Sequence, residues 1–412
     1  MRPVAAPRER LTPLETVWGM PYGRQLGVDP LPRTPAGPTG PAGRAGAGGV
    51  SALRAAVEDA VLPALRRPPC LVSFSGGRDS SVVLAVATAV ARREGLPDPV
   101  PYSHRFPAVP DSHESPWQEL VVGALDLGEW QRPRWSDEMD VLGPVARAAL
   151  RRDGVLPPFN GHLHEPVFAA AAGGSVLTGI GGDELFAPVE RYPVVRVAAR
   201  RAPLRWRRAP SLLFTAAAPG RWRARRTRRH LPVGFGWLRP PAARALRAEL
   251  ALDRASEPLR WDVSARTWAW PGRILQVAAR AKERAAGAHD VLVAHPFACA
   301  PVLAAAATTF GWAGPRGRAA EMPRHFGDLL PARLFAREDK AGFDGAFWAG
   351  PGREFARRWR GGGLDGALAD LVDPEALRAE WLSAAPDLHS LTLLQHAWLA
   401  QEGAAQGAVP AR

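Results

Sequence analysis

The chain contains very few cysteines and lysines for its 412 residues, with two of each. Cys70 and Cys299 are too few for a disulfide framework or a zinc-binding pattern, as is typical of a protein from the reducing cytoplasm. No run of about 18 or more apolar residues is present, and the first residues lack the apolar segment of a signal peptide. We therefore expect a soluble, globular, cytoplasmic protein without a membrane-spanning segment.

Acidic residues are missing from residues 191–230, which hold thirteen arginines and no Asp, Glu or Lys. This stretch accounts for the whole net charge of +13, because the rest of the chain carries equal numbers of basic and acidic residues. Such a segment can bind nucleic acid, an acidic peptide or an acidic carrier protein, or it can form a solvated helical face. The solvated face is the simplest interpretation, and we do not expect nucleic acid as a partner.

The most informative stretch is CLVSFSGGRDSSVVLAVATAV, residues 70–90. Residues 71–74 predict a short buried parallel strand that ends at Ser75, Gly76 and Gly77. A buried helix is expected next, because every residue from 82 to 90 except one threonine is apolar. The glycines let the backbone approach a ligand, and free N–H groups at the start of the helix favour an anion such as phosphate.

Asp79 lies inside this loop, where a carboxylate repels a polyphosphate unless a cation lies between them. Its presence predicts a nucleotide with bound Mg²⁺. The alternative is a strand-turn-helix joint in which Asp79 and its neighbouring serines only cap the helix. SGGRDSS is not a Walker loop, and it resembles the SGGxDS loop of the ATP-pyrophosphatase families. Those enzymes cleave ATP between the α and β phosphates and adenylate a substrate.

A second loop of the same kind occurs in SVLTGIGGDELFA, residues 175–187. The predicted strand 176–180 ends at Gly181 and Gly182, and Asp183 follows at the start of a helix. Because the carboxyl ends of parallel strands lie at one edge of a sheet, the two loops are expected to face each other. Asp79 and Asp183 could then share one Mg²⁺ ion. The alternative is that GGDE only caps a helix.

Predicted strands and helices alternate in this half of the chain, with further strands at 100–106 and 129–135. This order predicts an α/β fold with a doubly wound parallel sheet of the ATP-pyrophosphatase (adenine nucleotide α-hydrolase-like) type and a mostly helical C-terminal subdomain. We expect four parts: an N-terminal segment with a Pro/Gly-rich linker at 1–49, the ATP-pyrophosphatase core at 50–190, the arginine-rich segment at 191–230, and a helical part at 231–412 that completes the domain.

Together the two loops resemble the synthetase domain of asparagine synthetase and its relatives, β-lactam synthetase and the cyclases that close lasso peptides. Residues 283–297, ERAAGAHDVLVAHPF, resemble a degenerate copy of the family segment from DRxS to PFLD. Residues 333–343, RLFAREDKAGF, resemble its RxxKxxF segment. The similarity covers roughly residues 50–350, and the two glycine loops are its specific part.

The resemblance implies roles for individual residues. Lys340 matches the family lysine that stabilises negative charge as the carboxylate is activated and the amide forms, although a surface lysine is the alternative. Lys282 has no match and is expected to be structural. Asp79 and Asp183 would hold Mg²⁺. The residues expected to bind ATP and its pyrophosphate are Ser75, Gly76, Gly77, Asp79, Ser80, Gly181 and Gly182.

Three departures from asparagine synthetase concern the substrates. That enzyme has a glutamate where this chain has Ile180, which puts aspartate as the substrate in doubt, and an aspartate where it has Cys299. Its glutamine-hydrolysing members also begin with a nucleophilic cysteine and an amidotransferase domain, whereas about fifty residues precede the core here. The nitrogen donor is therefore expected to be free ammonia, ammonia from a separate amidotransferase subunit, or an amine on the substrate.

The leading hypothesis is an asparagine synthetase-like carbon–nitrogen ligase that adenylates a small-molecule or peptide carboxylate with ATP and forms an amide. A second hypothesis is intramolecular closure of a macrolactam or β-lactam in specialised metabolite biosynthesis. A third is a tRNA-modifying ATP-pyrophosphatase that uses the arginine-rich segment to bind phosphates. A fourth is a nucleotide-binding partner protein without activity.

Overall fold

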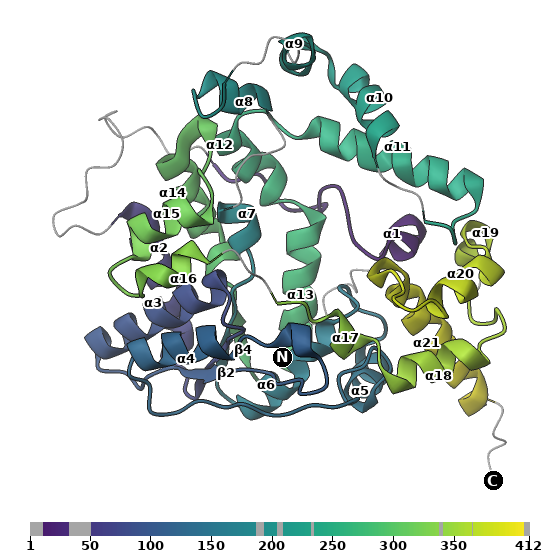
Figure 1. Ribbon diagram of the computed structural model, residues 1–412, viewed down its shortest axis with the longest axis horizontal. Helices are drawn as coiled ribbons and strands as arrows, with labels where there is room; N and C mark the ends of the chain where they lie inside the picture. The colour runs from purple at the N-terminus through teal and green to yellow at the C-terminus, as the bar shows by residue number, and fades with distance from the viewer. Residues whose placement is uncertain are drawn as a thin grey trace.

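A four-stranded parallel sheet lies in the lower half of the molecule in Figure 1, with the strand order β2-β1-β3-β4. The computed structural model describes residues 11–32, 51–186, 193–203, 209–231, 235–337, 341–364 and 366–407. The predicted linker and Lys340 lie outside these residues. The strands are β1 Cys70–Ser73, β2 Val100–Tyr102, β3 Ser175–Leu177 and β4 Leu292–Ala294. The predicted parallel sheet is confirmed.

Helices cover both faces of the sheet, because side chains along each strand alternate between two cores. Val72 and Leu177 face the larger core, which is formed with α2, α3 and α14. Leu71 and Val176 face the opposite core, which is formed with α6 and α13. The helices in the first half of the chain are α1 Pro13–Trp18, α2 Ala52–Leu65, α3 Arg78–Glu94, α4 Ser115–Ala124, α5 Pro144–Asp153, α6 Glu165–Ala170 and α7 Gly182–Phe186.

A separate core of tryptophan and leucine side chains joins the C-terminal helices to α1. Val17 of α1 packs there with Trp237, Trp359 and Leu394, so the N-terminal helix is part of the C-terminal body. The remaining helices are α8 Pro193–Ala198, α9 Ala209–Ala217, α10 Gly220–His230, α11 Pro240–Ser256, α12 Trp261–Ser264, α13 Arg273–Gly287, α14 Ala300–Phe310, α15 Arg318–Phe326, α16 Ala332–Ala336, α17 Asp344–Phe347, α18 Gly350–Arg358, α19 Ala367–Leu371, α20 Pro374–Trp381 and α21 Leu391–Gly407.

The strand predicted at residues 129–135 is wrong. The segment runs beside β2 and forms only isolated bridges, at Gln131 and Arg134. Pro133 has no N–H group to donate, so a continuous ladder cannot form through it. The fourth strand of the sheet is instead β4, at residues 292–294, where the sequence analysis predicted no strand.

Candidate active site

The loop between β1 and α3 folds around Ser80. The Oγ of Ser80 donates to the carbonyl of Gly77 at 3.1 Å and accepts from the N–H of Ser75 at 3.3 Å. Gly76 has a φ of 89°, and a Cβ there would lie 2.8 Å from the Cγ of Gln118, so the loop requires glycine at this position. Gly77 is the N-cap of α3, and no side chain caps this helix. The N–H groups of its first turn therefore remain available to an anion.

The loop between β3 and α7 lies directly against the first loop. A Cβ at Gly179 would come within 2.9 Å of the backbone of α3, and one at Gly182 within 2.4 Å of the Cγ of Asp79. Gly181 has a φ of 94°, and a Cβ there would lie 2.6 Å from the backbone of Phe297. The three glycines therefore let the carboxyl ends of β1, β3 and β4 meet at one edge of the sheet.

Asp79 and Asp183, the two predicted metal ligands, both contact the guanidinium group of Arg318. Arg318 donates from Nε and Nη2 to the two carboxylate oxygens of Asp79, each at 3.0 Å, and also from Nη2 to Asp183. The side chain of Asp79 is 24% exposed, and that of Asp183 is 74% exposed. Burial raises the pKa of Asp79, and the ion pair with Arg318 opposes this rise. The structure thus brings the two aspartates together around one cation, an arginine.

The donors at this point suit a divalent cation. Carboxylate oxygens are ligands that Mg²⁺ prefers, and two carboxylates converge here on one positive charge. Within the described ranges, no three His, Cys, Asp or Glu side chains are grouped to hold a metal ion. A Mg²⁺ ion between Asp79 and Asp183 would therefore need phosphate and water as its remaining ligands. Arg318 would also have to leave the position between them.

Arg318 is the first residue of α15, and sequence reasoning missed it. The loop before it is held by Arg201, which donates to the carbonyls of residues 313 and 314 at 2.9 and 2.8 Å. Arginine is so common in this chain that no local pattern distinguishes Arg318. The available signal was electrostatic, because two carboxylates at one sheet edge require a positive charge.

A buried ion pair connects the first glycine loop to the segment that carries Lys340. Arg337 donates to the two carboxylate oxygens of Glu114 at 2.7 and 2.8 Å and to the carbonyl of Gly76 at 2.9 Å. The side chains of Arg337 and Glu114 are only 3% and 6% exposed. Glu114 also accepts from the N–H of Ala341 at 3.0 Å. One carboxylate therefore holds residues on both sides of Lys340, and no motif in the sequence pointed to it.

Comparison with known families explains this combination of loops. The family model described as asparagine synthase matches residues 52–400. The chain belongs to the asparagine synthase family. A search of curated proteins gave no match. Membership confirms the predicted resemblance and implies an ATP-dependent amide ligase that joins a carboxylate to ammonia or an amine.

In the described parts of the chain, no helix is long and apolar enough to cross a membrane.

This asparagine synthase family chain has an apolar residue, Ile180, between the glycines of the second loop. Its side chain is partly buried against the larger core. Behind the loop, Thr178 and His295 are hydrogen-bonded at 2.6 Å between Oγ1 and Nδ1. Burial lowers the pKa of His295 to about 3, so its imidazole is neutral at physiological pH. The Thr178–His295 pair therefore adds no positive charge behind the loop.

Lys282 of the asparagine synthase domain is buried on α13. Burial lowers its pKa to about 8. Burial also lowers the pKa values of His164 and His295, and the charge of Lys282 adds to both shifts. Burial disfavours the charged ammonium, so the structural role expected for Lys282 has an energetic cost.

Proposed function

We propose that the chain is an ATP- and Mg²⁺-dependent carbon–nitrogen ligase of the ATP-pyrophosphatase type, which releases AMP and pyrophosphate. A substrate carboxylate attacks the α-phosphate of ATP, the bond to the bridging oxygen breaks, and pyrophosphate leaves. Ammonia or an amine then attacks the acyl-adenylate, loses a proton and expels AMP. The meeting of the two glycine loops around Asp79 and Asp183 is the observation that carries this proposal.

The loop residues bind the part of ATP that leaves. Pyrophosphate lies against Ser75, Gly76, Gly77 and Ser80, and it accepts hydrogen bonds from N–H groups in the first turn of α3. Gly181 and Gly182 form the opposite side of the same space. Mg²⁺ held by Asp79 and Asp183 would neutralise charge on the leaving pyrophosphate. The protein contributes mainly by positioning and by charge stabilisation.

Lys340 supplies positive charge where negative charge develops on the reacting carbonyl. A lysine suits this task because its charge is compact and strongly localised. The buried pair of Arg337 and Glu114 supports the assignment, because it holds both flanks of Lys340 close to Gly76.

The cysteines support a location for the enzyme. Cys70 and Cys299 are free thiols, which supports a reducing compartment such as the cytoplasm.

Pyrophosphate release tests the proposal. Purified protein is incubated with ATP, MgCl₂ and a panel of amino acid and peptide carboxylates, and hydroxylamine traps any acyl-adenylate as a hydroxamate. We expect release with at least one carboxylate and its loss in Asp79→Asn, Asp183→Asn and Lys340→Ala. Asp370→Asn changes an exposed aspartate on α19 and serves as the control. Full activity in any of the first three variants contradicts the role given to that residue.

Intramolecular amide closure is the second candidate, and Ile180 favours it. The expected position of the family glutamate is apolar here, which suits a substrate other than free aspartate. Mass spectrometry separates the two reactions. Closure removes one water from the substrate, whereas conversion of an acid to a primary amide lowers the mass by about one unit. The family match favours both candidates over tRNA modification.

A further inference from the structure

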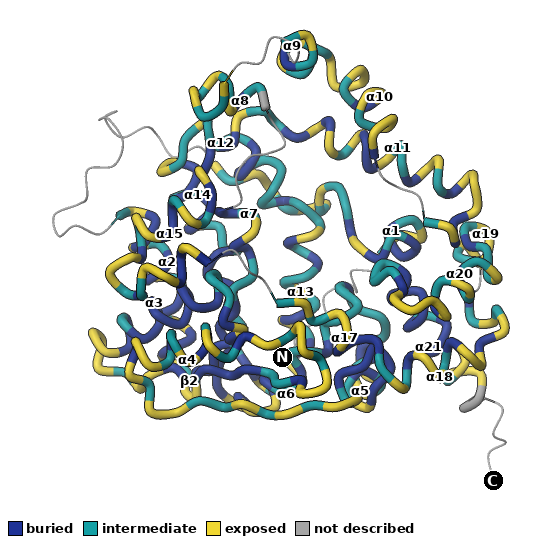
Figure 2. Tube along the Cα trace, in the orientation of Figure 1, coloured by how far each residue is buried: buried dark blue, intermediate teal, exposed yellow. Residues whose placement is uncertain are grey.

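Helix α10 carries an unbalanced positive charge on the surface. It contains six arginines and no acidic residue, and Ala224 is its only buried residue. Among the described residues, none of these six arginines forms an ion pair. Figure 2 shows the helix as a mainly exposed segment. Like charges three and four positions apart repel one another on a helix, so an anion bound here would stabilise it.

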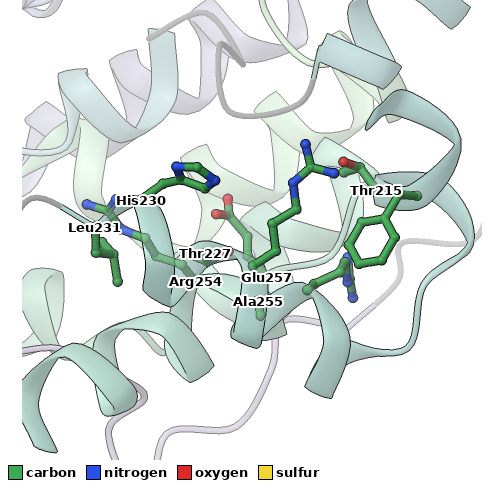
Figure 3. Close-up of a pocket in the computed structure, with 10 residues that line it drawn as sticks. Thr215, Thr227, His230, Leu231, Arg254, Ala255 and Glu257 are labelled. Carbon is green, nitrogen blue, oxygen red and sulfur yellow. The ribbon is translucent and has the colours of Figure 1, made fainter. Parts of the chain in front are cut away.

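A pocket of about 410 Å³ opens between α9, α10 and α11. Its basic lining comprises Arg223, Arg226, His230 and Arg254, and its apolar lining includes Phe214 and Leu231. Figure 3 shows His230 and Arg254 toward one end of the pocket and Thr215 toward the other. The pocket therefore offers several cationic groups beside an apolar surface.

Neither of the two α10 arginines that line the pocket is neutralised by a contact with an acidic group among the described residues. Arg226 donates to the Oγ of Ser211 at 2.8 Å, and its guanidinium lies 5.3 Å from the centre of the Phe214 ring. The Nε of Arg223 is buried and has no hydrogen-bond partner. Both guanidinium groups therefore keep their charge and their capacity for a carboxylate, which a guanidinium can bind with two parallel hydrogen bonds.

The occupant must combine negative charge with apolar side chains. Trp222 and Leu213 are 50% and 69% exposed on the same helices, so apolar surface continues beyond the pocket. Glu257 contributes a carboxylate to the wall, which opposes the regular negative charge of a nucleic acid backbone. A peptide can place an N–H group or a hydroxyl opposite Glu257 and its carboxylates opposite the arginines. These features favour an acidic peptide over RNA.

We propose that this pocket binds an acidic segment of the peptide on which the ligase acts. The inference rests on the proposed function, because it makes a peptide the source of the reacting carboxylate or amine. The pocket holds the peptide by a segment separate from the reacting group. Binding raises the local concentration of that group at the glycine loops without taking part in the chemistry.

Fluorescence anisotropy tests the proposal without ATP, so its result does not depend on the ligase reaction. The probe is a labelled peptide of about twelve residues in which Glu and Asp alternate with Leu and Phe. The first comparison probe has Gln and Asn at the acidic positions, and the second is a labelled oligouridylate of equal charge. The variant carries Arg223→Gln and Arg226→Gln, the two α10 arginines that line the pocket. A matched control carries Arg353→Gln and Arg357→Gln, which remove two exposed charges from α18.

We expect the acidic peptide to bind the native chain, and the α10 variant to bind it at least about tenfold more weakly. Binding should weaken with added salt, and the α18 control should match the native chain. Hydroxamate formation with a small carboxylate should be unchanged in the α10 variant. Absence of peptide binding, equal loss in both variants, or tighter binding of oligouridylate overturns the proposal. If the native chain forms no hydroxamate with any carboxylate, that result contradicts the proposed function and not the peptide-binding pocket.

Discussion

Arg318 donates to both carboxylate oxygens of Asp79, and the same guanidinium contacts Asp183. Asp79 is mostly buried, so without a nearby cation its ionised form would be unfavourable. The arginine therefore supplies the positive charge that the mostly buried carboxylate of Asp79 needs. This arrangement makes the removal of Arg318 informative about the proposed metal site.

We predict that Arg318→Ala lowers the free energy of unfolding by about 2 kcal/mol in EDTA, because Asp79 is left buried without its partner. Added MgCl₂ should stabilise this variant more than the native chain, since the ion no longer competes with the arginine. Denaturant unfolding with and without MgCl₂ measures both effects. Arg358→Ala, which breaks an exposed pair with Glu354, is the control. Equal stabilisation of Arg318→Ala and the native chain by MgCl₂ would contradict a site in which Mg²⁺ and Arg318 occupy the same position between the aspartates.

Gly182→Ala should move the Asp79 carboxylate, because the added Cβ would lie 2.4 Å from its Cγ. We expect pyrophosphate release to fall by about a hundredfold and stability to fall by about 1–3 kcal/mol. Gly123→Ala in α4 is the matched control, since a Cβ there meets nothing within 4 Å. That variant should be fully active and slightly more stable. Native activity in Gly182→Ala would show that the exact position of Asp79 is unimportant.

Glu114→Gln should weaken the buried pair with Arg337 and reduce activity through Lys340. We expect a loss of about 3 kcal/mol in stability and at least a tenfold decrease in kcat. The double variant Glu114→Gln/Lys340→Ala should be no less active than Lys340→Ala alone, because both substitutions remove the same contribution, that of the Lys340 side chain. Glu119→Gln, an exposed position on α4, should retain native kinetics. Additive losses in the double variant would mean that Glu114 acts independently of Lys340.

Lys282 should make stability depend on pH in the alkaline range. Its pKa is about 8 in the folded chain and 10.5 when solvated, so the unfolded chain binds more protons between these values. The free energy of unfolding should therefore rise by about 3 kcal/mol between pH 8 and pH 10.5. Lys282→Met should remove this rise and be more stable than the native chain at pH 7. Urea unfolding at several pH values measures this rise in the free energy of unfolding. A variant with the same pH profile as the native chain would show that Lys282 does not cause the rise.

The glycine loops and their strands could be predicted because their signals are local. Gly76 and Gly77 follow a short apolar run, and Gly181 and Gly182 follow another, so each strand-turn-helix unit is visible in its own sequence. The parallel order then places Asp79 and Asp183 at one sheet edge without further information. This part of the site depends on few contacts between distant residues.

Contacts between distant residues account for what could not be predicted. Arg318 is 239 positions from Asp79, and Arg337 is 223 positions from Glu114, so neither pair leaves a pattern in any short window. The short strand β4 contains no turn or period that distinguishes it from the end of a helix. The packing of α1 against C-terminal helices likewise depends on tertiary contacts formed by residues such as Val17.

The second glycine loop also limits which of its positions can change during evolution. Side chains at 179, 181 and 182 would collide with α3, Phe297 or Asp79, so substitutions there disturb the edge of the sheet where the two loops meet. Ile180 lies between them and packs against the core, where a different side chain need not displace either loop. Position 180 is therefore freer to vary than the three glycines around it, and the meeting of the two loops does not depend on it.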